Sequence, residues 1–222
     1  KYAVKTYCIY NPMEGVSLPR KKTSDIRLLD KKEQLCLEEY VSKIHNSTTL
    51  GITLAMTTGI RIGELCALQW KDIDLEKRIL TVSKTVQRIQ LHEADRKTKL
   101  IITEPKSESS KRIIPIPEAV VAFLKEMREN DEDFVVSGTS RVIEPRTMQY
   151  RFAKILKNVN LPSVHFHALR HMFASNCIRL GFDIKALSEI LGHSSVEITL
   201  NRYVHSSFEQ KTEYMNRITI CV

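Results

Sequence analysis

Apolar residues recur at helical spacing through most of the chain, and an alternating pattern interrupts them in the middle. The first clear element is residues 30–44, which open with the Asp and Glu of a capping box. Leu35, Leu37, Val41 and Ile44 then recur as the apolar set of an amphipathic helix. We therefore expect this helix to lie against a core.

Two more helices are predicted directly after it. Residues 48–58 are nearly all apolar or small, which is typical of a buried helix, and Gly59 is a suitable end for it. Residues 62–70 predict a short helix with Arg61 at its entrance.

The middle of the chain predicts strands. Residues 78–90 alternate and are rich in Val, Ile and Thr, and residues 100–103 and 112–116 form two further strand patterns. A turn is expected at 105–110, and residues 92–99 form a polar, charged excursion. We interpret this region as one small antiparallel sheet.

The rest of the chain returns to helical patterns, apart from a short buried strand expected at 134–137. Pro117 stands at or near the first position of one helix, and Gly181 and Gly192 are placed to end two others. The fold class predicted is α+β and mainly α-helical. The helices expected here span residues 117–129, 145–158, 167–180, 183–191, 195–204 and 206–216.

The chain has 222 residues and is 42% hydrophobic, which is enough for one large domain or one domain plus a remnant. We expect residues 28–222 to form the main domain, with a tail at 206–222, and residues 1–27 to hold the end of a preceding domain and a basic linker. An ordinary solvated tail is the alternative for that linker. Because the first residue is Lys1 rather than Met, we expect the chain to be part of a longer protein.

The net charge is +8 and the pI about 9.2, which favours a polyanionic partner. An anionic membrane surface is disfavoured, because no apolar run reaches transmembrane length and no signal peptide is visible. Between residues 141 and 202, nine Lys and Arg stand against four Asp and Glu. The five widely spread cysteines indicate a reducing cytoplasm rather than a disulfide framework. Nucleic acid is therefore the expected partner.

One histidine-rich stretch carries the candidate chemistry. In a helix, His167, Arg170 and His171 share one face, where a guanidinium and two imidazoles could hold a phosphate. Tyr203 follows downstream. The hypothesis is a phosphodiester held by Arg and His and attacked by a tyrosine hydroxyl.

Two other interpretations of these histidines stay open at this point. His165, His167 and His171 resemble a metal cluster, but no acidic residue lies between Val164 and Arg179, and a His-x-x-x-His pair without the Glu of a zincin is a weak signal. Histidines that only cap or pack within a helix are also common.

Four segments in order resemble the boxes of one family. They are residues 57–65 (TTGIRIGEL), 105–116 (PKSESSKRIIPI), 167–171 (HALRH) and 191–205 (LGHSSVEITLNRYVH). Together they resemble the catalytic domain of tyrosine recombinases of the lambda-integrase type. The match runs from about residue 28 to residue 214. One box alone would be weak evidence, whereas four in the right order are strong.

The resemblance implies a role for each matching residue. Tyr203 would attack the DNA phosphate and form a 3′-phosphotyrosyl bond. Arg61 and Arg170 would hold the non-bridging oxygens, His167 would accept the tyrosine proton or mediate its transfer, and His193 would donate a hydrogen bond to the phosphate. No ATP, metal or other cofactor is required by this scheme.

Lys106, on the expected turn, would protonate the departing 5′ oxygen, although Lys84, Lys99 and Lys111 are the alternatives along the hairpin. Glu64 would orient Arg61 or cap the local helix, and His171 would support the site from behind. The residues expected to contact DNA are Arg20, Lys21, Lys22, Lys111, Arg112, Arg146 and Arg151.

The function expected is that of a site-specific DNA recombinase of a mobile element, an integrase of a conjugative transposon or phage. The lengthened hairpin and the charged linker favour this reading over an Xer-type chromosome dimer resolvase. A type IB topoisomerase and a non-cleaving DNA-binding relative are the further alternatives. The partners implied are double-stranded DNA at attachment or transposon-end sites, an excisionase, and copies of the same chain in a tetramer. In that tetramer the tail 206–222 would dock on a neighbour, unless it folds onto its own domain.

Overall fold

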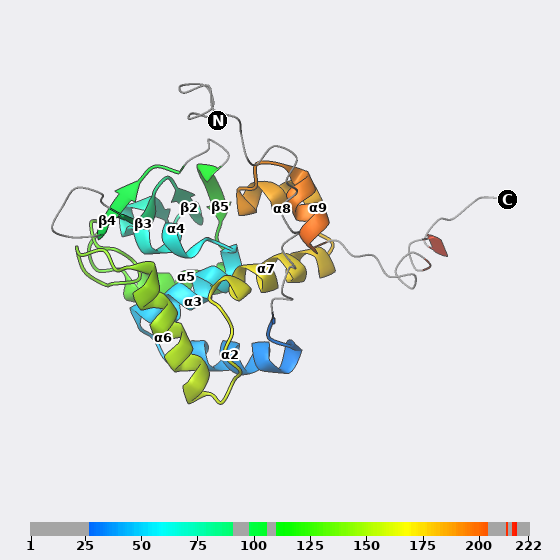
Figure 1. Cartoon of the computed structure of the whole chain (residues 1–222), viewed down its shortest axis with the longest axis horizontal. Helices are drawn as coiled ribbons and strands as arrows, with labels where there is room; N and C mark the ends of the chain where they lie inside the picture. Colours follow the sequence, from blue (N-terminus) through cyan, green and yellow to red (C-terminus); the bar gives the residue numbers. More distant parts are fainter. Residues whose placement is uncertain (1–26, 91–97, 106–109, 204–211, 213–214, 217–222) are drawn as a thin grey trace, which may run out of the picture.

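The computed structural model describes residues 27–90, 98–105, 110–203, 212 and 215–216. Figure 1 shows a helical body with small sheets along one side and a helical unit at one corner. The elements are α2 (Lys31–Lys43), α3 (Ser47–Thr58), α4 (Ile62–Ala67), the 3₁₀ helix η1 (Trp70–Asp72), β1 (Ile73–Asp74), β2 (Ile79–Val82), β3 (Thr85–Gln90), β4 (Thr98–Thr103), β5 (Arg112–Pro115), α5 (Glu118–Met127), α6 (Pro145–Asn158), α7 (His167–Arg179), α8 (Ile184–Leu191) and α9 (Val196–Tyr203). The expected α+β, mainly helical fold class is confirmed.

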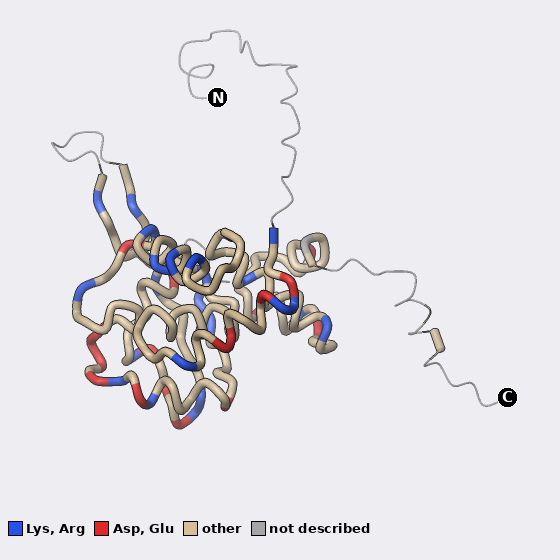
Figure 2. The backbone as a smooth tube through the Cα atoms, turned by 90° about the horizontal axis from the view of Figure 1, so that it is seen from below, with Lys and Arg blue, Asp and Glu red and all other residues tan. Residues whose placement is uncertain are grey.

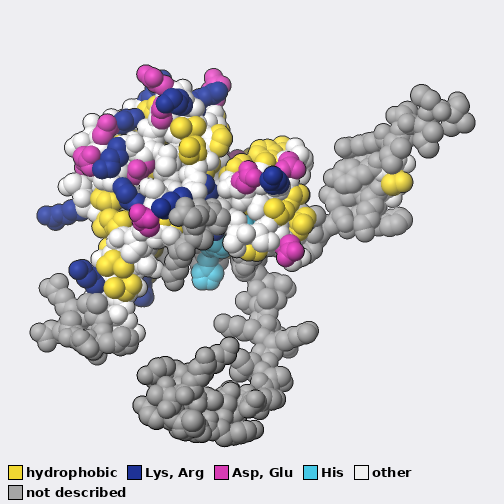
Figure 3. Space-filling view, turned by 90° about the horizontal axis from the view of Figure 1, so that it is seen from above, with side chains coloured by type: hydrophobic (Ala, Val, Ile, Leu, Met, Phe, Trp, Pro, Cys, Tyr) yellow, Lys and Arg dark blue, Asp and Glu magenta, His cyan; other side chains and the backbone are white. Residues whose placement is uncertain are grey.

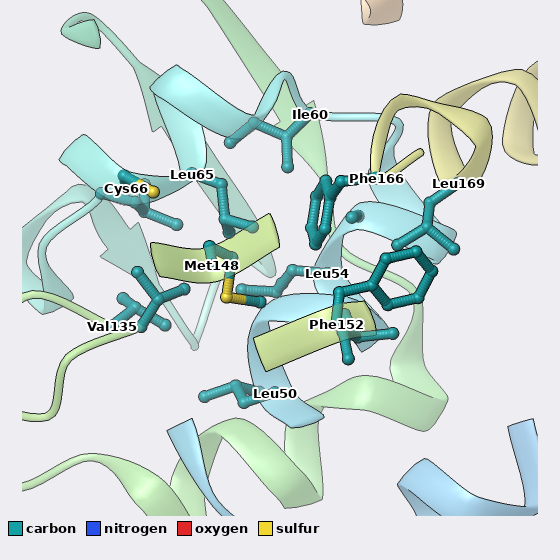
Figure 4. Packing of buried hydrophobic residues seen from close by; sticks show 14 of the residues in the cluster. Leu50, Leu54, Ile60, Leu65, Cys66, Val135, Met148, Phe152, Phe166 and Leu169 are labelled. Atoms are coloured by element: carbon teal, nitrogen blue, oxygen red, sulfur yellow. The ribbon is translucent and has the colours of Figure 1, made fainter. Parts of the chain in front are cut away.

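Helix α3 is the centre of the body and contacts α2, α5, α6 and α7. The sequence predicted a buried helix here, and Leu50, Ile52 and Leu54 are fully buried. Figure 4 shows Leu50 and Leu54 packed with Met148 and Phe152 of α6. The fully buried apolar side chains of α3 face these neighbours, whereas Thr53, Met56 and Thr57 are only partly covered.

The capping box predicted for α2 is present, because the Asp30 carboxylate accepts from the backbone of Glu33 while the Glu33 carboxylate accepts from the Asp30 N–H. The predicted apolar set was half right. Leu37 and Val41 are buried, but Leu35 is 56% exposed and Ile44 lies beyond the last helical residue. The buried stripe of α2 is therefore narrower than the spacing indicated.

The single strand predicted over residues 78–90 is wrong. It is divided into β2 and β3, which belong to two different sheets with the orders β1-β2-β5 and β3-β4. Leu80, Val82 and Val86 are all buried, so the alternation continues across the break. The alternation of buried and exposed side chains shows which face of a strand is buried, but not which strand it pairs with. The pattern therefore did not reveal that the chain passes from one sheet to the other.

The strand pairs in the described residues are all antiparallel, and Val82 of β2 is paired with Arg112 of β5. The β3–β4 hairpin is an excursion between these two residues. Figure 2 shows it projecting from the body, with Lys and Arg along both arms. The expected excursion at 92–99 lies outside the described residues except for Thr98 and Lys99, which belong to β4.

Other predicted boundaries moved by small amounts. Residues 62–70 form α4 followed by the start of η1. Pro117 is the N-cap residue of α5, one position before the first helical residue. No strand forms at 134–137; instead Phe134 makes isolated bridges to Gln69 and Thr139, and Val135 and Val136 are buried in a turn. The helices predicted at 145–158, 167–180, 183–191 and 195–204 are all present within one or two residues.

Helices α8 and α9 pack on the second half of α7 around a small core of their own. Its buried members are Ala174, Cys177, Leu187 and Leu191, and Tyr203 packs against it. Figure 1 shows this unit beside β5, at one end of α7. Most of the helix predicted at 206–216 lies outside the described residues. Among the described residues, none of the helices has the length and apolarity needed to span a membrane.

Candidate active site

A buried carboxylate organises the arginines of the site. Glu64 is 4% exposed, and its two oxygens bind Arg61 Nη1 at 2.8 Å and Arg112 Nη2 at 2.8 Å. Burial alone would raise the pKa of the Glu64 carboxyl, but hydrogen bonds and charge from Arg112 and then Arg61 hold it below its usual value. Glu64 is therefore an anion that fixes two cations.

Arg61 stands at the N-terminus of α4 and reaches across the domain. Its Nη2 donates to the carbonyl of Gly192 at 2.7 Å, while the Glu64 carboxylate also accepts from its backbone N–H at 3.0 Å. The side chain is about one third exposed, so part of the guanidinium faces solvent. Arg61 thus joins the start of α4 to the end of α8.

Arg170 comes from the first turn of α7 and is 3% exposed. It donates to the carbonyl of Gly59 at 2.7 Å and to that of Leu191 at 2.8 Å. Burial, and after it the positive charges of Arg61 and Arg112, lowers the pKa of the Arg170 guanidinium to about 9. The guanidinium still carries its charge at neutral pH.

The tyrosine lies beside the histidines of the site. The rings of Tyr203 and His193 are nearly parallel with centroids 6.4 Å apart, and the ring of His171 lies 5.4 Å from that of Tyr203. His171 in turn contacts His167 edge-on at 4.7 Å. The Nδ1 of His193 lies 2.8 Å from the buried hydroxyl of Thr199, which fixes the orientation of that ring.

These groups surround an open pocket of about 270 Å³. Figure 3 shows histidine side chains gathered at one place on the surface. The pocket is polar and lies where α4, α7 and the turn after α8 meet, which is a suitable place for an anionic group held by several cations. The residues that line it are Arg61, Ser110, His167, Arg170, Gly192, His193, Ser194 and Ile198.

The structure brings together most of the residues that the sequence singled out. Arg61, His167, Arg170 and His193 line one pocket, and Tyr203 adjoins it. Glu64 and His171 are buried behind it, as a supporting position requires. Four of the predicted residues lie outside the described residues, namely Arg20, Lys21, Lys22 and Lys106.

The other residues expected to contact DNA differ in their surroundings. Lys111 pairs with Glu104, Arg146 lies over the ring of Tyr150, and Arg151 donates to a backbone carbonyl. The expectation for Arg112 is not met, because its side chain is only 6% exposed and its donors are bound within the protein. The signal was present in the sequence, since Arg112 shares the alternating face of Ile114 and Ile116, both of which are buried.

A metal cluster at the histidines was the competing interpretation. Within the described part of the chain, no group of three or more His, Cys, Asp or Glu lies together in a way that could hold a metal ion. The rings of His167 and His171 contact each other, His171 and His193 lie beside Tyr203, and His193 lies against Thr199.

Residues 27–210 match the model of the phage integrase family. A protein described as "Tyrosine recombinase XerC-like" from Caldanaerobacter subterraneus subsp. tengcongensis is 32% identical over 95% of this chain. The transposase from transposon Tn916 of Enterococcus faecalis is 28% identical over 85% of this chain. The chain spans 60% of the length of the first relative and 50% of the second.

Two solved structures show the same fold. The integrase of transposon Tn1549, in complex with a circular intermediate DNA, is 25% identical, with a TM-score of 0.76 over 98% of this chain and 74% of the other. The XerA recombinase is 26% identical, with a TM-score of 0.61 over 91% of this chain and 68% of the other.

Proposed function

Because this chain belongs to the phage integrase family, we propose that it cuts and rejoins DNA as a site-specific recombinase, through a 3′-phosphotyrosyl intermediate. The observation that carries the proposal is the meeting of Arg61, His167, Arg170 and His193 around one pocket, with Tyr203 beside it. These residues come from distant parts of the chain. A purely structural set of arginines and histidines would not need to converge on an open pocket next to a tyrosine.

The geometry suits attack on a phosphodiester. A tyrosine hydroxyl ordinarily titrates near pH 10, so it needs proton transfer and a stabilised phosphate to react at neutral pH. The guanidinium groups of Arg61 and Arg170 would bind the non-bridging oxygens, because a planar fork of donors matches two oxygens. His193 would donate a hydrogen bond to the phosphate from the nitrogen that Thr199 does not engage.

The proton steps complete the scheme. His167 would accept or pass on the proton of Tyr203, and His171, whose ring contacts both side chains, would hold them from behind. Lys106 would protonate the departing 5′ oxygen. The ester conserves the bond energy, so a second DNA 5′-hydroxyl reverses the reaction without ATP.

Integration of a mobile element is the biological role that we propose. The Tn916 transposase and the Tn1549 integrase support it, and the projecting β3–β4 hairpin agrees with it. Chromosome dimer resolution is the second candidate, because the Xer-like relative is 32% identical. The Tn1549 integrase was solved with a circular intermediate DNA, which supports DNA as the substrate. We propose double-stranded DNA, acted on in the bacterial cytoplasm.

Assembly and domain roles complete the proposal. Residues 28–222 would be the catalytic domain, and residues 1–27 would end a preceding DNA-binding domain and supply a basic linker. Four copies would act on paired sites, with the tail 206–222 of each docking on a neighbour, and an excisionase would direct excision.

Covalent trapping on nicked site DNA tests the chemistry. We expect the wild-type chain to form a protein–DNA adduct on a denaturing gel, and Tyr203→Phe to form none while it binds DNA normally in a gel-shift assay. Tyr40→Phe, in the half-buried stretch of α2, is the matched control and should react like wild type. An adduct that survives Tyr203→Phe would identify another nucleophile. A two-site recombination assay then separates a recombinase from a topoisomerase, which only relaxes supercoils.

A further inference from the structure

Arg112 is bound on every side by the protein itself. Its Nη1 and Nη2 donate to the two oxygens of Glu64 at 3.1 and 2.8 Å, and its Nε donates to the carbonyl of Ile190 at 2.6 Å. Nη1 also donates to the carbonyl of Ser110 at 3.1 Å. The side chain is 6% exposed and does not line the pocket. Arg112 is therefore in no position to bind a DNA phosphate directly.

The partners of Arg112 are the supports of the pocket. Glu64 binds Arg61, and Ile190 belongs to the last turn of α8. The carbonyls that follow in the chain are also bound by arginines, that of Leu191 by Arg170 and that of Gly192 by Arg61. Consecutive carbonyls at the negative end of one helix thus accept from arginines of β5, α7 and the start of α4.

This arrangement sets the position of His193. Gly192 ends α8 in the left-handed conformation, with φ of 64°, and the next residue is His193 in the pocket. Any displacement of the last turn of α8 would move the His193 ring and the carbonyl on which Arg61 rests. Arg112 controls both, since it holds the turn through Ile190 and Arg61 through Glu64.

We propose that Arg112 is a positioning residue for DNA cleavage: it fixes Glu64 and the last turn of α8 so that Arg61 and His193 face the same phosphate, without contacting the DNA. The inference rests on the proposed function of the pocket and adds to it. A guanidinium is required because it binds both carboxylate oxygens and a carbonyl at once. Without it, the Glu64 carboxylate would have Arg61 as its remaining arginine partner and would draw that guanidinium away from the pocket.

The test compares Arg112→Met and Arg112→Lys in the full chain. We expect Arg112→Met to slow single-turnover adduct formation about 100-fold at saturating DNA, because a displacement of about 1 Å in a reacting group has that effect. Its Kd for DNA should stay within about threefold, since few phosphate contacts change. Arg112→Lys should recover the melting temperature of wild type more fully than the cleavage rate, because it keeps the charge and loses the fork.

Arg128→Met is the matched control. Arg128 also joins a carboxylate, Asp131, to a backbone carbonyl, that of Ile73, but it lies away from the pocket. We expect it to cleave at the wild-type rate. If Arg112→Met and Arg128→Met slow cleavage equally, the effect is general destabilisation and the proposal is wrong. A loss of DNA affinity that matches the loss of rate would show that Arg112 contacts DNA and would equally overturn it.

A double-mutant cycle with Arg61→Ala tests the route. Because Arg112 acts on Arg61 through Glu64 and on His193 through Ile190, the double variant should lose less activity than the product of the two single losses, since the effects of coupled residues do not add. Fully multiplicative losses would contradict the proposal.

One readout does not depend on cleavage. Histidine ring NMR signals should shift at His193 in Arg112→Met and stay unchanged in Arg128→Met. An unchanged His193 signal overturns the role of Arg112 even if the chain proves inactive. Absence of an adduct from a folded wild-type chain would instead contradict the proposed function.

Discussion

Arg170 donates a hydrogen bond of 2.7 Å to the carbonyl of Gly59, the residue that ends α3 in the left-handed conformation with φ of 64°. The same guanidinium holds Leu191 of α8. Arg170, which we propose binds the phosphate, therefore joins the end of α3 to the end of α8. All three meet at Gly59. A side chain at Gly59 would separate all three, because its Cβ would lie 2.5 Å from Phe173 and 2.9 Å from Leu191.

Gly59→Ala should lower the free energy of unfolding by about 2–5 kcal/mol, from left-handed strain and overpacking together. Gly181→Ala is the control, since Gly181 has φ of 80° and nothing within 4 Å of an added Cβ. It should cost only about 1–2 kcal/mol from strain. Urea unfolding of both variants gives the difference, and equal losses would show that the contact at Gly59 is loose.

Glu64→Gln should destabilise the protein by about 3 kcal/mol at neutral pH, because it removes the anion from a buried ion pair. Since the folded-state pKa of Glu64 lies below its ordinary value of 4.5, the stabilisation is complete above that value and is lost as the pH falls through the folded-state pKa. The melting temperatures of wild type and Glu64→Gln should therefore converge on acidification. Glu129→Gln, at an exposed position, should track wild type at every pH. A gap that does not narrow in acid would contradict the ion-pair explanation.

Thr199→Val should slow single-turnover cleavage by about tenfold to a hundredfold, because the hydroxyl that orients His193 is removed while the volume is kept. Thr53→Val is the control. The buried hydroxyl of Thr53 has no hydrogen-bond partner among the described residues, so its loss should be neutral or slightly stabilising. A wild-type cleavage rate in Thr199→Val would show that His193 is oriented by other contacts.

Lys106→Ala should slow cleavage of ordinary DNA by about 10²–10⁴-fold, the usual contribution of a general acid. On DNA with sulfur at the 5′ bridging position, a thiolate leaves without a proton, and the variant should approach the wild-type rate. Parallel rate measurements on the two substrates decide the role, and equal slowing on both would remove Lys106 from it.

DNA binding should weaken steeply as salt rises, because a chain of net charge +8 releases counterions when it meets phosphates. About six phosphate contacts would give a log–log slope of about −5 on duplex DNA. Fluorescence anisotropy across a salt series measures the slope. A flat response would place the basic surface away from the DNA.

The sequence predicted the helices well, because capping signals are local, whereas the convergence of Arg61, His167, Arg170 and His193 on one pocket followed from the family resemblance. Arg61 at the start of α4 and Gly192 at the end of α8 are examples of such local signals. It failed where the answer depended on a partner distant in the chain. Strand 78–90 divides between two sheets, and Arg112 is buried against Glu64, although charge alone indicated a surface position.

The pairing of Val82 with Arg112 fixes both ends of the segment that lies between them. The chain leaves the three-stranded sheet after Val82 and returns opposite the same residue, so the intervening segment is a closed excursion whose ends are fixed. Doubling the length of a flexible loop costs only about 0.6 kcal/mol in closure entropy. Changes of length at the outer end of the hairpin, between Gln90 and Thr98, can therefore be accommodated while Arg112 keeps its register, whereas Val86, which is buried, and Ser110, which lines the pocket, are held near the body.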